Sequence, residues 1–176
     1  MKYVILLALL SISNVLAAEM VLGEREIDPG VRLTFEIAPK DVVIPTDLHL
    51  AENKTDVHIE VLAVWSASAP AGFPEDGFVG YLRVEARVTN ERTGDSAEFV
   101  LTPHLNLVDS LHYAQNIKLP GPTDDLYEVT FRVGSARQAL GLHFDWVDTY
   151  GSSLIDDQKF TFSGLALGPM ANAYRR

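Results

Sequence analysis

The sequence has 176 residues with no cysteine, and 24 acidic against 14 basic side chains give a formal net charge of −10. This acidity argues against nucleic acid or an anionic lipid surface as a partner. A chain of this size can bury a self-sufficient core, so the fold does not require disulfide bonds. Without thiolates, a metal ion would have to be held by histidine, carboxylate, methionine or backbone groups.

The first 17 residues have the features of a secretory signal peptide. Lys2 supplies the positive start, residues 4–10 form an unbroken apolar run, and small residues surround a cleavage point after Ala17. The apolar run is too short to span a bilayer, which takes about 20 residues. We therefore expect residues 1–17 to be removed on export. Residues 18–176 should then form one domain in the bacterial periplasm, without stable membrane insertion.

Alternation of apolar and polar residues predicts strands along most of the remaining chain. The expected strands cover residues 31–37, 56–65, 81–88, 98–101, 126–133 and 159–165. A hairpin turn is expected at residues 90–94 and loops at 70–77 and 120–122, whereas only residues 135–142 hint at a short helix. About seven short strands separated by turns predict an all-β fold, an antiparallel β-sandwich.

Histidines are the candidate metal ligands of this chain. There are five of them, at His49, His58, His104, His112 and His143. His58 and Glu60 are two residues apart in an expected strand, so both side chains project from one face at a spacing that suits one ion. His104 and His112 belong to residues 102–113, which are expected to be a loop, and His143 precedes another turn. Imidazole and carboxylate ligands suit Fe, Cu, Zn or Ni.

Motifs of other kinds of site are missing from the sequence. It has no Gly-x-Ser-x-Gly nucleophile elbow, no phosphate-binding glycine-rich loop and no His-Glu-x-x-His zinc helix. The acidic pairs at residues 124–125 and 156–157 lie in turn-like contexts, where neighbouring acids are usually solvated. We therefore expect a binding protein and not an enzyme.

Several stretches, in a fixed order, resemble the periplasmic iron-transport proteins, which are Fe(II)-transport or copper-binding proteins encoded beside an iron permease. These stretches lie at residues 55–60, 77–82, 89–94, 101–103 and 112–117. The resemblance implies an immunoglobulin-like β-sandwich, usually a homodimer, that binds a transition metal near its surface. It also implies binding of Fe, Cu or both, with Zn able to substitute, and transfer of the metal to an inner-membrane permease.

The resemblance also implies a set of ligands. His58 and Glu60 match the histidine and glutamate of the family's first strand motif. His112 matches the histidine of a later His-Tyr segment, and His143 matches a third histidine. His49 lies outside the matched motifs and is expected to be a surface histidine.

Two departures from the family pattern affect this ligand set. Where the family has a methionine ligand after a proline, this chain has Pro103 and His104, and its loop to His112 is one residue longer, so either His104 or Leu105 takes the methionine's place. A histidine there would reduce the preference for Cu(I) relative to Cu(II), Zn(II) or Fe(II), and a leucine would remove one ligand. The second departure is the pair at residues 110–111, which replaces Gly-Pro and affects the placing of His112.

Two other functions are also compatible with the sequence. One is a copper or iron redox enzyme in which Glu60 acts as a base beside the metal, and the other is a structural or interaction sandwich that has lost its metal site. For the metal-binding function, neutral imidazoles are required, so affinity should fall as the pH drops through about 6.5.

Overall fold

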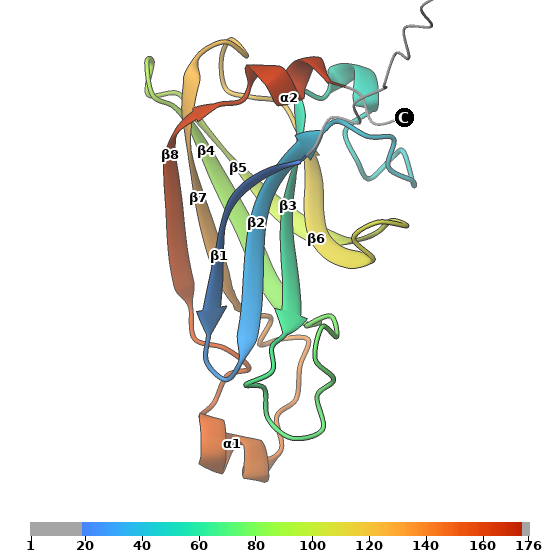
Figure 1. The fold of residues 1–176 in the computed structure, drawn as a ribbon, viewed down its shortest axis with the longest axis vertical. Coiled ribbons are helices and arrows are strands. Elements are labelled where there is room, and N and C mark those ends of the chain that lie inside the picture. Colours follow the sequence, from blue (N-terminus) through green and yellow to red (C-terminus); the bar gives the residue numbers. More distant parts are fainter. Residues whose placement is uncertain (1–18, 174–176) are drawn as a thin grey trace, which may run out of the picture.

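The computed structural model describes residues 19–173, so the expected signal peptide lies outside the described residues. Within them the chain forms eight strands and three short helical segments (Figure 1). The strands are β1 (Met20–Ile27), β2 (Val31–Pro39), β3 (Val57–Trp65), β4 (Leu82–Asn90), β5 (Ser96–Leu105), β6 (Leu111–Ile117), β7 (Leu126–Ser135) and β8 (Gln158–Ala166). The helical segments are η1 (Glu52–Lys54), α1 (Phe144–Tyr150) and α2 (Gly168–Asn172).

All strand pairs are antiparallel, in the order β1-β2-β3-β6-β5-β4-β7-β8. The strand β5 belongs to both layers, because residues 96–101 pair with β4 whereas residues 102–105 pair with β6. Figure 1 shows β5 crossing from one layer to the other. The predicted all-β antiparallel sandwich is therefore confirmed, with two layers that are continuous through this strand.

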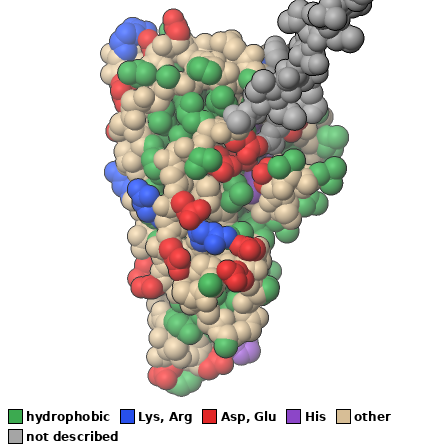
Figure 2. Space-filling view, viewed as in Figure 1, with side chains coloured by type: hydrophobic (Ala, Val, Ile, Leu, Met, Phe, Trp, Pro, Cys, Tyr) green, Lys and Arg blue, Asp and Glu red, His purple; other side chains and the backbone are tan. Residues whose placement is uncertain are grey.

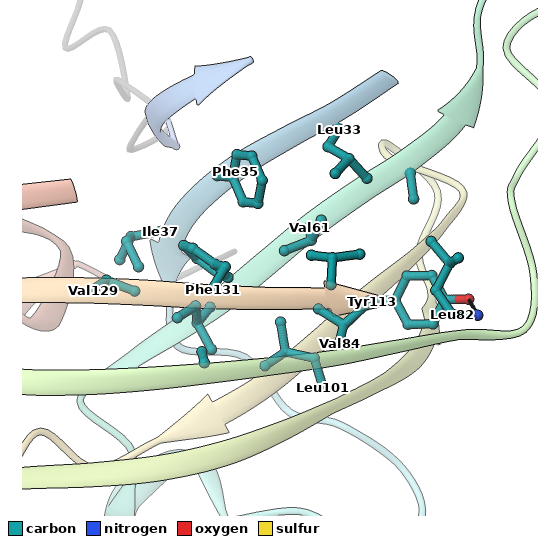
Figure 3. Close-up of a cluster of buried hydrophobic side chains, with 14 of the residues drawn as sticks. Leu33, Phe35, Ile37, Val61, Leu82, Val84, Leu101, Tyr113, Val129 and Phe131 are labelled. Atoms are coloured by element: carbon teal, nitrogen blue, oxygen red, sulfur yellow. Dashed lines mark hydrogen bonds between the residues drawn. The ribbon is translucent and has the colours of Figure 1, made fainter. Parts of the chain in front are cut away.

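The core lies between the layers and is built from the inward side chains of the alternating strands. Phe35 of β2 is fully buried, and its ring lies 4.8 Å from that of Phe131 of β7 in the opposite layer (Figure 3). Burial of such a side chain contributes about 1.5–3 kcal/mol to stability. On β6, the Tyr113 hydroxyl donates to the Val79 carbonyl and accepts from the Leu82 amide. These bonds fix the strand that carries His112.

The structure corrects the sequence-based strand assignment at several places. The strand β1 was not predicted, because a bulge between Val21 and Gly23 breaks its alternation. The strand β6 was also missed, because most of its residues are buried on both faces and so do not alternate. The helix suggested at residues 135–142 does not form. Ser135 is the last residue of β7, where its hydroxyl bonds to the backbone of Ile155, and residues 137–139 then form a turn.

No helix within residues 19–173 combines the length and the apolar character needed to cross a membrane.

Candidate metal centre

The candidate site lies on the outer face of β3, β6 and the end of β5. His58 and Glu60 project from this face of β3, as their spacing predicted. His104 and His112 were expected in a loop, but they are directly paired residues of the β5–β6 hairpin. Ala114 pairs with both Glu60 and Thr102, and its small side chain leaves room between the polar groups of the flanking strands.

Three of the predicted ligands meet in this space. His58, His104 and His112 each offer a ring nitrogen, and the three nitrogens lie within 4.8 Å of one another. Nitrogens bound to one tetrahedral ion lie roughly 3.3 Å apart, so a small inward movement of the side chains would complete a three-histidine site.

Hydrogen bonds orient two of these imidazoles. His58 Nδ1 lies 2.7 Å from Asn116 Oδ1, and the side-chain nitrogen Nδ2 of Asn116 donates to the Asp41 and Leu50 carbonyls. His112 Nδ1 lies 3.1 Å from the Ser110 carbonyl oxygen. Since both partners are acceptors, each Nδ1 carries a proton, and in the neutral ring each Nε2 then has the lone pair that a metal ion needs.

The Ser110 carbonyl is placed by an unusual backbone conformation. Ser110 has a φ of 59°, in the left-handed region that glycine adopts most easily. The sequence departure at residues 110–111 is therefore accommodated: serine takes the left-handed conformation, and its carbonyl orients His112.

Glu60 lies between the two oriented histidines. Its carboxylate oxygens are 3.7 Å from His58 Nε2 and 4.0 Å from His112 Nε2. Glu60 is fully buried, and His58 and His112 are only 2% and 1% exposed. A carboxylate at this position would balance the charge of a cation bound by the two imidazoles.

A group of carboxylates that includes Glu60 lies beside the three histidines. Oxygens of Glu19, Glu60 and Asp109 lie within 4.8 Å of one another. Figure 2 shows acidic side chains gathered beside a patch of histidine on this face of the molecule. The approach to the histidines is therefore negatively charged, which attracts cations.

A cavity of about 510 Å³ opens over the cluster and is lined by His58, His104 and His112 together with residues 41–45. His104 faces into it, and its Nε2 is buried without a hydrogen-bond partner among the described residues. Leu105 is 73% exposed. Of the two residues that compete for the place after Pro103, His104 is therefore the one that joins the other histidines.

Burial lowers the pKa of His104 from 6.5 to about 4, and the neighbouring His49 and His112 add to this effect. The unfolded chain takes up this proton near pH 6.5, before the folded protein does, so folded stability should fall as the pH drops from 6.5 to 4. The ring is partly exposed, so we expect a loss of roughly 1–2 kcal/mol. Denaturant titrations of the metal-free protein at pH 7 and 4.5 would measure it. The variant His104→Gln should show a smaller loss, and an equal loss would contradict this assignment.

His143 lies far from the cluster within one chain. It is exposed at the start of α1, whose Trp146 contacts Phe73, which in turn packs on Trp65 at the far end of β3. His58 is near the opposite end of that strand, about 23 Å away at about 3.3 Å per residue. Figure 1 shows α1 at the end of the molecule remote from the start of β3.

His49, predicted to be a surface histidine, is partly exposed in the structure. It is half-buried, lines the same cavity, and its ring centroid lies 4.8 Å from that of His104. Sequence reasoning also missed Asn116, the partner of His58. Assigning β6 as a strand would have placed Asn116 on the face of His112, whereas His49 comes from a loop with no periodic pattern.

The model of the Fe2+ transport protein family matches residues 16–165. The chain belongs to this family. Its resemblance to the iron-transport proteins, inferred from the sequence, is thereby confirmed. Comparison with curated protein sequences gave no match.

Solved structures show the same fold as this member of the Fe2+ transport protein family. A copper-bound variant of Campylobacter jejuni P19 is 24% identical, with a TM-score of 0.69 over 84% of this chain and 96% of that chain. A copper-bound variant of FetP from uropathogenic Escherichia coli strain F11 is 22% identical, with a TM-score of 0.68 over 84% of this chain and 99% of that chain.

Proposed function

We propose that this protein binds a transition-metal ion in the cavity formed by His58, His104 and His112, with Glu60 as a further ligand or counter-charge. The observation that carries the proposal is that three imidazole nitrogens converge beside a buried carboxylate. Two of these imidazoles are oriented by hydrogen bonds at their other ring nitrogen. The ion would be Fe, Cu or both, and Zn would substitute.

The donor set favours borderline and harder ions. A site of imidazoles and carboxylate contains no thioether, so it should prefer Cu(II), Zn(II) or Fe(II) to Cu(I). This preference follows if His104 takes the place of the family's methionine ligand.

The proposed role is in high-affinity iron uptake. Residues 1–17 would direct export and be removed, residues 18–176 would work in the periplasm, and the bound metal would pass to an inner-membrane permease. Membership of the Fe2+ transport protein family supports this role, as does the related FetP protein, which was expressed in the periplasm of Escherichia coli.

Metal analysis of protein purified from the periplasm tests the binding function. We expect close to one Fe or Cu ion per chain, and near-complete loss of it in His112→Ala. The variant Thr102→Ala, on the neighbouring strand, should keep its metal. Metal-free wild-type protein, or equal metal in the wild type and His112→Ala, would refute the proposal.

We also propose that the protein is a homodimer in which His143 of one copy supplies a ligand to the cavity of the other. The distance between His143 and the cluster requires a second copy if His143 is to be a ligand. Exposed apolar side chains of Val42, Ile44 and Leu105 surround the cavity, and Phe144, next to His143, is 81% exposed. Such apolar surfaces are typical of an interface.

Sedimentation and metal titration of His143→Ala test the dimeric site. Loss of one ligand should lower Cu(II) affinity by about tenfold or more. The replacement Tyr150→Ala, at the other end of α1, serves as a matched control and should change affinity little. A wild-type protein that stays monomeric at all concentrations, with unchanged affinity in His143→Ala, would contradict the proposal.

A further inference from the structure

A fourth histidine lies at the mouth of the metal cavity, outside the three-histidine cluster. His49 comes from the loop between β2 and η1, and its ring contacts that of His104 with centroids 4.8 Å apart. His104 in turn lies 5.3 Å from the ring of His58. Since His49 is half-buried and His58 is 2% exposed, the three rings form a path from the surface to the interior.

His49 is oriented in the same way as His58 and His112. Its Nδ1 lies 3.3 Å from Gln115 Oε1. That oxygen also accepts a hydrogen bond from the Asn116 backbone N–H at 3.1 Å. The Gln115 atom facing His49 is therefore the carbonyl oxygen and acts as the acceptor. His49 Nδ1 therefore carries the proton, and its Nε2 keeps a lone pair. An imidazole held by an oxygen acceptor at one nitrogen is the usual arrangement of a metal-ligating histidine.

The separation of the two rings also suits a shared ion. Two imidazoles bound to one ion at neighbouring coordination positions have centroids roughly 4.5–5 Å apart, given metal–nitrogen bonds of about 2 Å. The His49–His104 centroid separation of 4.8 Å lies within this range. His104 Nε2 has no hydrogen-bond partner among the described residues, so no polar group competes with a metal ion for this nitrogen.

We propose that His49 and His104 form an outer binding station for a divalent transition-metal ion. The ion first binds this pair and then passes to His58 and His112 while His104 remains bound. Because one protein ligand is kept throughout, the ion exchanges its ligands stepwise and does not return fully to water. This inference rests on the proposed function and adds a route to the same site.

Stopped-flow transfer of Cu(II) from a chromophoric chelator to the chelator-stripped full chain tests the station. In His49→Gln, loading and removal should both slow by about tenfold, whereas the equilibrium Kd should change by less than about threefold. A station on the route accelerates both directions equally, whereas a ligand of the final site would mainly change the removal rate. The variant Gln115→Leu keeps His49 but removes its acceptor, and should slow both rates by a smaller factor.

The outcomes separate this inference from the proposed function. Unchanged rates in His49→Gln would overturn the station and leave the three-histidine site intact. A weaker Kd with an unchanged loading rate would also overturn it, because His49 would then be a ligand of the inner site. Failure of the wild-type protein to take up Cu(II) at all would refute the proposed function itself. Equal slowing in both directions would support the station.

Discussion

Replacing both His58 and His112 by alanine should abolish the rise in melting temperature that Cu(II) or Zn(II) gives the unaltered, chelator-stripped protein. A ligand present at one hundred times its Kd stabilises the folded state by about 2.7 kcal/mol. For a domain of this size, that corresponds to a rise of roughly 5–10 °C. The double variant keeps His104 alone of the three clustered nitrogens, so its metal affinity should fall by more than about a thousandfold.

Melting curves followed by circular dichroism, with and without metal, would measure this effect. The variant His49→Gln changes a histidine outside the cluster, with little expected effect on the Kd, and should keep a clear rise. If the wild-type melt does not move with Fe, Cu or Zn, the protein is a structural or interaction sandwich that has lost its metal site. If metal raised the melting temperature of the His58 and His112 double variant as much as that of the wild type, the metal would bind outside the three-histidine cluster.

Replacing Glu60 by glutamine should lower metal affinity by about 10–100-fold while leaving the fold intact. Glutamine keeps the shape of the side chain but cannot supply the negative charge that would balance a bound cation. The carboxylate oxygens of Glu60 lie 3.7 and 4.0 Å from the two Nε2 atoms. An ion bound by neutral imidazoles alone would carry its full charge into a buried site, which is unfavourable. Calorimetric titration with Cu(II) would measure the change.

The matched control is Glu36→Gln. Glu36 is the cross-strand partner of Glu60 and is also buried, so the same charge is removed one strand away. Its effect should be several-fold smaller, and equal effects would mean that net charge matters more than position. If Glu60→Gln kept its metal but lost a redox or hydrolytic turnover, Glu60 would be a base and the protein an enzyme.

Strands in which apolar and polar residues alternate could be predicted from the sequence. Burial alternates along the whole of β4, at the start of β2 and at the end of β3, and the strands predicted there and at β7 were confirmed. The strand β6 is buried on both faces, so its pattern does not distinguish it from a loop that returns to the sheet. This error placed His104 and His112 in a loop, although they are paired residues of a hairpin.

The site itself could be predicted only in part. The spacing of His58 and Glu60 correctly predicted that both side chains share one face of a strand. Their burial could not be predicted, because it depends on the segment 41–50 and on the β5–β6 hairpin, which approach from distant parts of the chain. His49 belongs to that loop, and only the folded structure brings it to His104.

A Cu(II)-loaded crystal, with an anomalous difference map at the copper edge, tests the central claim most directly. The proposed site predicts one strong peak inside the cavity, about 2.0–2.3 Å from Nε2 of both His58 and His112 and within bonding distance of a His104 nitrogen. A map without a peak there, or with copper bound only at surface carboxylates away from these histidines, would contradict it.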